Sequence, residues 1–246
     1  MKASGETIDP EEIARFAAHA ASWWDPAGSF RPLHRLNPVR LQFIRDELTA
    51  HFGRDPRSLA PFSGLTLCDV GCGGGLIAEP MARLGLAVTG IDADGDAIAI
   101  AREHAASGGL KIDYRCETAE SLVGEGRRFD VVLALEIVEH VAEPDALLAA
   151  CAALVKPGGA FIGATLNRTP QSYALAIVGA EYVMRWLPRN THDWRRFLRP
   201  SEFVLGLGRA GLKATRLKGL RYRPTRGDWA LSDDLSVNYL VMAVKK

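Results

Sequence analysis

The sequence predicts an α/β fold in which helices cover a mostly parallel sheet. From Leu65 onward, short β-rich runs alternate with helical segments, which is the pattern of successive βαβ units. Residues 131–135 are apolar without interruption, as expected for a strand that is buried on both faces of such a sheet. A glycine-rich loop between the first strand and the next helix makes the predicted fold Rossmann-like.

Composition and charge bound the class of protein. The 246 residues are 48% hydrophobic and 24% charged, which predicts one globular domain over residues 1–246. The formal net charge of +1 gives no reason to expect nucleic acid or membrane to be bound through overall electrostatics. Four cysteines without a C-x-x-C spacing indicate thiols in a reducing compartment, so a cytoplasmic protein is expected.

The first 60 residues are expected to form a helical N-terminal lid. Asp9 and Glu12 have the spacing of a capping box, and Pro10 suits the first helical position, so a helix should run from there to about Trp23. Residues 24–38 hold three prolines without a clear period. A second, shorter helix is expected over residues 39–50.

The C-terminal third departs from the βαβ pattern. Residues 169–199 are interpreted as an insertion, and a helix is expected near residues 201–209. Two β-rich runs, residues 213–220 and 235–245, predict an antiparallel hairpin at the edge of the sheet.

The loop Asp-Val-Gly-Cys-Gly-Gly-Gly, residues 69–75, indicates a nucleotide-type cofactor. Glycines such as Gly71 and Gly73 let the backbone turn sharply and approach a ligand closely. The spacing also satisfies a loose dinucleotide pattern, so the glycines do not separate NAD from S-adenosylmethionine, and a ligand-free turn is the bland alternative. Asp69 favours S-adenosylmethionine, because a carboxylate repels a pyrophosphate and attracts a sulfonium and an ammonium.

Two further positions are predicted to contact the cofactor. Asp92 ends the second strand at the distance where an acid binds ribose hydroxyls; the alternative is that it caps the following helix. Thr118 and Ala119 follow the third strand, where the adenine ring is expected. Because Thr118 stands where an acid is common, that contact is expected through the backbone.

Acids and a histidine follow the fourth strand, at the sheet edge where ligands bind in open α/β folds. In a helical turn, Glu136, Glu139 and His140 share one face, from which they could bind a divalent metal or supply a base. His140 is the first choice for the base that removes a hydroxyl proton, with Glu136 as a second catalytic candidate. Magnesium or manganese suits these ligands, and zinc is left open. In the alternative, Glu136 contacts the cofactor while Glu139 and His140 cap a helix.

Motifs along nearly the whole chain resemble the ubiquinone biosynthesis O-methyltransferases, which are class I methyltransferases that act on polyprenylated phenol and catechol intermediates. The resemblance rests on WWD at 23–25, PLHRLNPVR at 32–40, DVGCGGG at 69–75, LEIVEH at 135–140, TLNR at 165–168, VGAEY at 178–182, THDW at 191–194 and VNY at 237–239. It implies cofactor contacts at Arg40, Gly71, Asp92 and Leu135. It also implies a magnesium site at Glu136, Glu139 and His140, and two O-methylations, on a 2-polyprenyl-6-hydroxyphenol and on a demethylubiquinol.

A polyprenylated phenol or quinol resides in the bilayer, so peripheral contact with the inner face of the cytoplasmic membrane is expected. In residues 169–199, aromatic and aliphatic residues are interleaved with or followed by arginines, which suits an interfacial segment; the alternative is that the segment only covers the active site.

Two other readings come from different classes of protein. A basic run over residues 209–226 raises RNA or DNA methylation, but residues 135–138 lack the Asn/Asp-Pro-Pro-aromatic motif of amino-directed base methylases, so no nucleic-acid partner is expected. The other alternative is a non-catalytic scaffold within a complex of ubiquinone enzymes.

Overall fold

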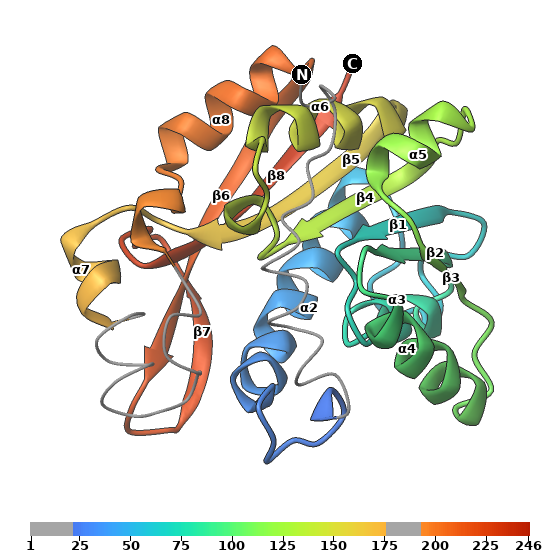
Figure 1. The fold of residues 1–246 in the computed structure, drawn as a ribbon, viewed down its shortest axis with the longest axis horizontal. Coiled ribbons are helices and arrows are strands. Elements are labelled where there is room, and N and C mark those ends of the chain that lie inside the picture. The colour runs from blue at the N-terminus through green and yellow to red at the C-terminus, as the bar shows by residue number, and fades with distance from the viewer. Residues whose placement is uncertain (1–21, 176–192) are drawn as a thin grey trace.

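The computed structural model describes residues 22–175 and 193–246 of the chain (Figure 1). Within them, helices flank an eight-stranded sheet. The strands are β1 (Thr66–Val70), β2 (Ala87–Asp92), β3 (Asp113–Cys116), β4 (Phe129–Leu135), β5 (Val155–Leu166), β6 (Leu212–Arg223), β7 (Asp228–Ser232) and β8 (Asn238–Lys245). The helices are α2 (Arg31–His51), α3 (Ala78–Arg83), α4 (Gly95–Ser107), α5 (Ala119–Gly124), α6 (Pro144–Leu154), α7 (Pro170–Ser172) and α8 (Pro200–Arg209), with the 3₁₀ turns η2 (Val138–His140) and η4 (Trp194–Arg196).

The strand order places the candidate site. It is β3-β2-β1-β4-β5-β8-β6-β7, and β1 to β5 run parallel, as predicted. The direction of winding reverses between β1 and β4, and open α/β sheets bind ligands beyond the carboxyl ends of the strands at such a point. The glycine loop follows β1 and the acid and histidine segment follows β4, so both predicted elements lie at this edge.

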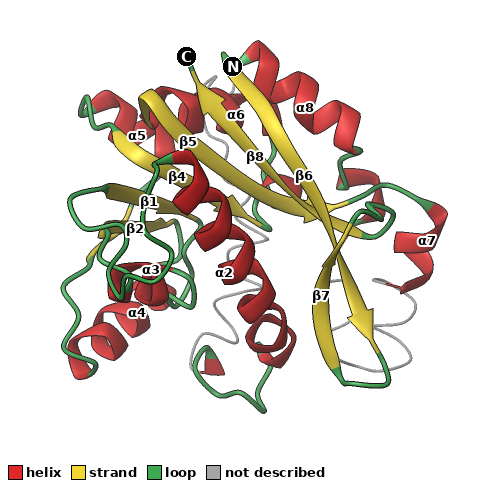
Figure 2. Cartoon of the chain, turned by 180° about the vertical axis from the view of Figure 1, so that it is seen from behind, coloured by secondary structure: helices red, strands yellow, loops and turns green. Residues whose placement is uncertain are grey.

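Two apolar layers hold the helices onto the sheet. On one face α2, α3 and α4 pack against alternate residues of β4, including Val131 and Leu133, and Figure 2 shows α2 across this face. On the other face α5, α6 and α8 pack against the intervening Val132 and Ala134. This alternation is why β4 is apolar without interruption.

The N-terminal prediction was wrong in its boundary, because α2 begins at Arg31 rather than at Val39. Pro32 lies in the first turn, where no intrahelical N–H bond is needed, so it starts the helix instead of breaking it. Pro38 lies inside and removes one backbone bond, while side chains such as Phe43 are buried in the core, each stabilising by about 1.5–3 kcal/mol. The helix predicted from Asp9 lies almost entirely outside the described residues.

The predicted C-terminal pairing is confirmed and extended. β8 pairs antiparallel with both β5 and β6, so it lies inside the sheet rather than at its edge. The edge strand is β7, which the sequence analysis missed; it pairs antiparallel with β6. Its short apolar stretch gives a weak periodic signal, and the pairing is supported by an ion pair between Arg223 and Asp228 at 2.6 Å. None of the helices in the described part of the chain is long and apolar enough to cross a membrane.

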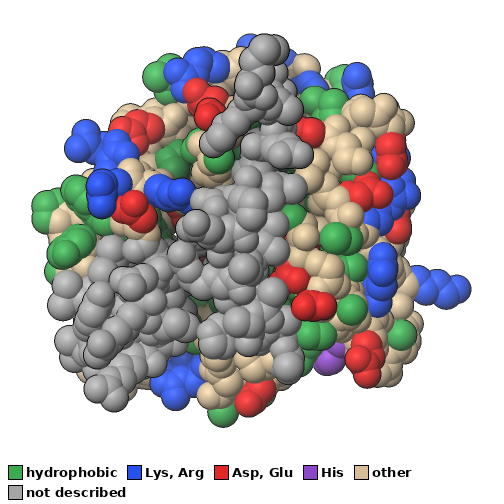
Figure 3. All heavy atoms as spheres, in the orientation of Figure 1, with side chains coloured by type: hydrophobic (Ala, Val, Ile, Leu, Met, Phe, Trp, Pro, Cys, Tyr) green, Lys and Arg blue, Asp and Glu red, His purple; other side chains and the backbone are tan. Residues whose placement is uncertain are grey.

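Four of the seven residues of the basic run over 209–226 pair with carboxylates in the structure. The sequence shows no acid between these residues, but other elements supply carboxylates. Figure 3 likewise shows acidic and basic side chains interspersed over the described part of one face. The ion pairs join Arg209 to Asp145, Arg216 to Glu47, Lys218 to Asp233 and Arg223 to Asp228.

Candidate functional site

The glycine loop is fixed by its backbone conformation and by packing. Gly71 has φ +73° and Gly73 has φ +51°, which side chains rarely adopt. The Gly71 N–H donates to the carbonyl of Ile91 at 2.8 Å, which ties the loop to the end of β2. A Cβ on Gly71 would collide with the side chain of Ile137, so that glycine also permits close packing beside the β4 end.

Two carboxylates lie close together at this loop, Asp69 buried and Asp92 partly buried. Asp69 is 3% exposed, and its Oδ2 has no hydrogen-bond partner among the described residues. Burial, and then the neighbouring Asp92 carboxylate, raise the pKa of Asp69 to about 7. Burial also raises the pKa of Asp92. Such a pair favours a cationic ligand, so these residues fit the sulfonium and ammonium groups of the expected cofactor.

Asp92 is not the cap of the following helix. Its Oδ2 accepts from the Gly73 N–H at 2.8 Å and its Oδ1 from the Asp94 N–H at 2.9 Å. Asp94 caps α4 instead, accepting from the N–H groups of Asp96 and Ala97. Each carboxylate oxygen has two lone pairs, so Asp92 keeps the capacity to accept from ribose hydroxyls.

The predicted adenine segment lies at the start of α5. Thr118 is the N-cap, and its hydroxyl accepts from the Ser121 N–H at 3.2 Å. Ala119 is buried in the core beneath it. Because the Thr118 hydroxyl is engaged in the cap, an adenine contact here would use the backbone; that contact stays a prediction.

Arg40 and Glu136 form a largely buried ion pair at the other half of the site. They are 96 residues apart in sequence, and their side chains meet at 2.5 Å between Nη2 and Oε1. The side chain of Arg40 is 4% exposed and that of Glu136 19%. A second Arg40 nitrogen is 3.4 Å from Oδ1 of Asn37, so α2 fixes the guanidinium beside the end of β4.

Glu136 adopts a strained backbone conformation. It has φ +53°, the only positive value for a non-glycine residue among those described. Left-handed backbone at such a residue costs about 1–2 kcal/mol and concentrates at functional sites. The Glu136 N–H donates to the carbonyl of Ala164 at 2.9 Å, which holds the turn immediately after Leu135, the last residue of β4.

The expected common helical face of Glu136, Glu139 and His140 is not formed. Glu136 precedes the 3₁₀ turn η2, which contains only Val138–His140, so the helical spacing does not apply to all three. Glu139 is buried, and its Oε2 accepts from the Thr165 hydroxyl at 2.9 Å. Burial, and then the adjacent Glu136 carboxylate, raise the pKa of Glu139 to about 8.

The structure shows no preformed metal site at Glu136, Glu139 and His140. Across the described ranges, no three His, Cys, Asp or Glu side chains are placed to hold a metal ion together. Arg40 already neutralises Glu136, and Glu139 lies beneath the surface. Ligation would require Glu136 to leave Arg40, so the magnesium site stays a prediction.

Sequence reasoning missed the partners that set the state of this cluster. Thr165 was noted only within a motif, although its hydroxyl binds Glu139 from β5. Asn37 was likewise noted only as part of a motif. In a sequence, neither carries a signal that distinguishes a polar core contact from a surface residue.

Comparisons with known proteins find a matching family model and relatives of nearly the same length. Residues 68–163 match the family model described as "Methyltransferase domain". The chain is 54% identical to the ubiquinone biosynthesis O-methyltransferase of Parvibaculum lavamentivorans, with 98% of this chain and 96% of the relative covered. It is also 54% identical to the protein of that name from Dinoroseobacter shibae, over 100% of this chain and 99% of the relative.

Solved structures share the fold at lower identity. The magnesium protoporphyrin IX methyltransferase of Synechocystis, solved with bound SAM, aligns with a TM-score of 0.60 at 18% identity, covering 99% of this chain and 100% of that one. A SAM-dependent methyltransferase from Thermotoga maritima aligns with a TM-score of 0.62 at 16% identity, covering 96% of this chain and 99% of that one. The fold is therefore that of the class I methyltransferases, as predicted.

Proposed function

Because the chain belongs to the family of ubiquinone biosynthesis O-methyltransferases, we propose that it methylates phenolic hydroxyls of polyprenylated intermediates of that pathway. Both O-methylations are included, on a 2-polyprenyl-6-hydroxyphenol and on a demethylubiquinol. The observation that supports this proposal most directly is the Asp69 and Asp92 carboxylate pair, which suits a cationic methyl donor and lies at the same sheet edge as the strained Glu136 turn.

Different residues of the chain have different roles in the proposed methyl transfer. Bound S-adenosylmethionine supplies an electrophilic methyl group on a sulfonium. Asp69 would stabilise the cationic end of the donor, Asp92 would accept from its ribose hydroxyls, and Arg40 would bind its carboxylate. His140 accepts the proton of the phenolic hydroxyl as the oxygen attacks, with Glu136 as the alternative base.

The test is methyl transfer by the purified full chain. We would incubate it with S-adenosylmethionine and a short-chain prenylated catechol or 6-hydroxyphenol, with and without EDTA, and follow the O-methyl product by mass spectrometry. Product with both acceptors supports the assignment and excludes a scaffold as the sole role. No product, with the cofactor bound and with lipid and magnesium supplied, overturns it. Loss of product in EDTA supports a metal, and unchanged turnover argues against one.

His140→Gln tests the base. We expect its rate to fall about 10²–10⁴-fold with little change in cofactor affinity, as for loss of a general base. The matched control is His51→Gln, because His51 contacts the Gly158 carbonyl at 2.9 Å, outside the site. A His140→Gln enzyme with the wild-type rate would move the role to Glu136.

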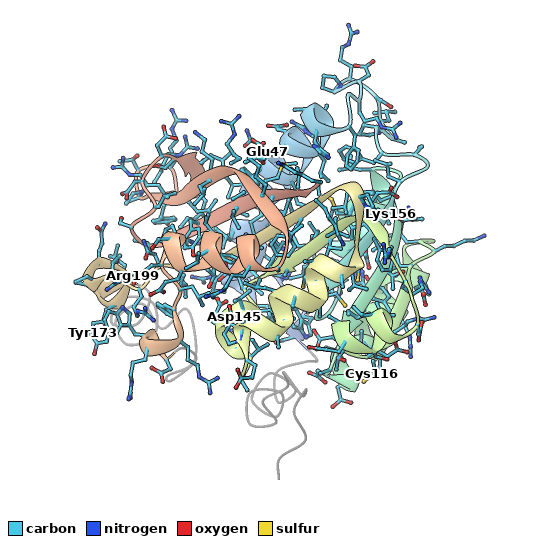
Figure 4. The ribbon with its side chains drawn as sticks, turned by 90° about the horizontal axis from the view of Figure 1, so that it is seen from above. Glu47, Cys116, Asp145, Lys156, Tyr173 and Arg199 are labelled. Carbon is cyan, nitrogen blue, oxygen red and sulfur yellow. The ribbon has the colours of Figure 1, made fainter. Side chains whose placement is uncertain are left out.

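We also propose peripheral contact with the inner face of the cytoplasmic membrane. Of the segment interpreted as interfacial, residues 176–192 lie outside the described part of the chain. At the described margins of the segment, Tyr173 is 49% and Leu175 51% exposed. Tyr173 lies at the same end of the molecule as the exposed Arg199 (Figure 4), so aromatic, aliphatic and basic groups gather there, as in interfacial segments.

Vesicle sedimentation tests this contact. The double variant Tyr173→Ser and Leu175→Ser should bind vesicles containing anionic lipid several-fold more weakly than wild type. The control is Leu59→Ser, because Leu59 is 93% exposed and lies between α2 and β1, outside that segment. Equal binding by the double variant and the control would favour the alternative, in which the segment only covers the active site.

A further inference from the structure

Trp23 and Trp24, before α2, lie against the glycine loop. A Cβ on Gly74 would lie 2.6 Å from Cγ of Trp23, and a Cβ on Gly73 would lie 2.6 Å from Cζ2 of the same ring. Cβ atoms do not approach other atoms so closely, so the indole fills the space that a side chain at either glycine would need. The Trp24 Nε1–H donates to the Gly74 carbonyl at 2.9 Å.

The position of this aromatic pair is fixed from several sides. The ring of Trp23 stacks on Phe30 with centroids 3.8 Å apart, and the backbone carbonyl of Trp23 lies 2.8 Å from Nε2 of His34. The ring of Trp24 stacks on His104 of α4 at 3.5 Å. Contacts with α2, α4 and the loop therefore hold Trp23 as one wall of the glycine loop.

The indole N–H of Trp23 meets no acceptor in the described part of the chain. Its Nε1 is buried and lacks a hydrogen-bond partner among the described residues. By contrast, the indole N–H of Trp194 donates to the Thr169 carbonyl at 2.9 Å. Buried indole N–H groups normally find a partner, so the one beside the cofactor loop points to an acceptor on the ligand.

We propose that Trp23 is a further cofactor-contacting residue. Its ring covers Gly73 and Gly74, and its Nε1–H donates to an oxygen of bound S-adenosylmethionine. The cofactor offers carboxylate and ribose oxygens, and Asp92, expected at the ribose, already binds the Gly73 N–H. The proposal rests on the cofactor assignment of the loop and does not depend on which phenol is methylated.

Calorimetric titration of the purified full chain with S-adenosylmethionine tests it. Trp23→Phe keeps an aromatic ring and removes the N–H, so we expect Kd to rise about tenfold. The Tm of the cofactor-free variant should equal that of the cofactor-free wild type. Trp23→Ala should bind at least as weakly. Trp194→Phe is the matched control. It loses the indole hydrogen bond to the Thr169 carbonyl, which does not involve the glycine loop, so its Kd should be unchanged.

Two outcomes would overturn the proposal. Wild-type affinity in Trp23→Phe would show that the N–H is not used by the cofactor. Tighter binding in Trp23→Ala would show that the ring occupies the volume of the cofactor and must leave it. Because titration needs no methyl acceptor, either outcome leaves the proposed substrate class standing.

Discussion

The half of the site around the glycine loop, residues 69–75 and Asp92, is built from neighbouring parts of the sequence, whereas the half at the end of β4 joins Arg40 and Glu136 across 96 residues. In the first half, conformation is local: glycines turn the backbone, and an aspartate stands just before them. In the second half, the environment of Glu136 depends on Arg40, which lies on α2, far away in the sequence. The glycine-loop half should therefore respond to changes in backbone and charge, and the half around Arg40 and Glu136 to loss of a partner.

The largest effect on stability is expected at the long-range pair. Arg40→Met should lower the free energy of unfolding by about 3 kcal/mol, because it leaves Glu136 largely buried without its cation. Urea denaturation measures this. Adding Glu136→Gln to Arg40→Met should recover part of the lost stability. If Arg40→Met alone were as stable as wild type, the ion pair would not contribute to the stability of the fold.

A glycine substitution should break the local half next. Gly73→Ala and Gly53→Ala both place a side chain at positive φ, with values of +51° and +61°, so each should cost about 1–2 kcal/mol. The two sites differ in their surroundings: a Cβ on Gly73 would meet the ring of Trp23, whereas a Cβ on Gly53 meets nothing within 4 Å. We expect Gly73→Ala to weaken cofactor binding at least tenfold and Gly53→Ala to leave Kd unchanged; equal Kd values would contradict this.

The charge of Asp69 should make cofactor affinity depend on pH. With a pKa of about 7, Asp69 is mostly protonated at pH 6, so Kd should be about tenfold higher there than at pH 8. Asp69→Asn should bind weakly and with a flat profile. In the cofactor-free protein, the free energy of unfolding should decrease as the pH rises from about 4 to 7. Over that range Asp69 keeps its proton in the folded protein but has lost it in the unfolded chain, because its pKa is raised by folding. A steep pH profile in Asp69→Asn would assign the titration to another group.

The smallest effect is expected far from both halves. Arg216 pairs with Glu47 of α2 at 3.2 Å, and its side chain is 55% exposed. Solvent screens such a pair, so Arg216→Ala should change the free energy of unfolding by at most about 0.5–1 kcal/mol. If Arg216→Ala lowered the free energy of unfolding as much as Arg40→Met does, exposure would not explain why the two ion pairs differ.

Local patterns in the sequence determined the alternating strands and helices, the parallel sheet, the glycine loop and the family. They could do so because strand burial and glycine backbone freedom are properties of short segments. The sequence also placed Asp69 and Glu136 at the same sheet edge, through the rule for open α/β folds.

Only the tertiary structure decided which partner each polar group has. It gave the cap of α4 to Asp94 and left Asp92 for the loop, and it paired Arg40 with Glu136. It also buried Glu139 against Thr165 and paired four residues of the basic run with carboxylates. It also placed Trp23 over the glycines. The physical reason is that hydrogen bonds, ion pairs and pKa shifts depend on distance and burial between residues far apart in the chain, which no short pattern encodes.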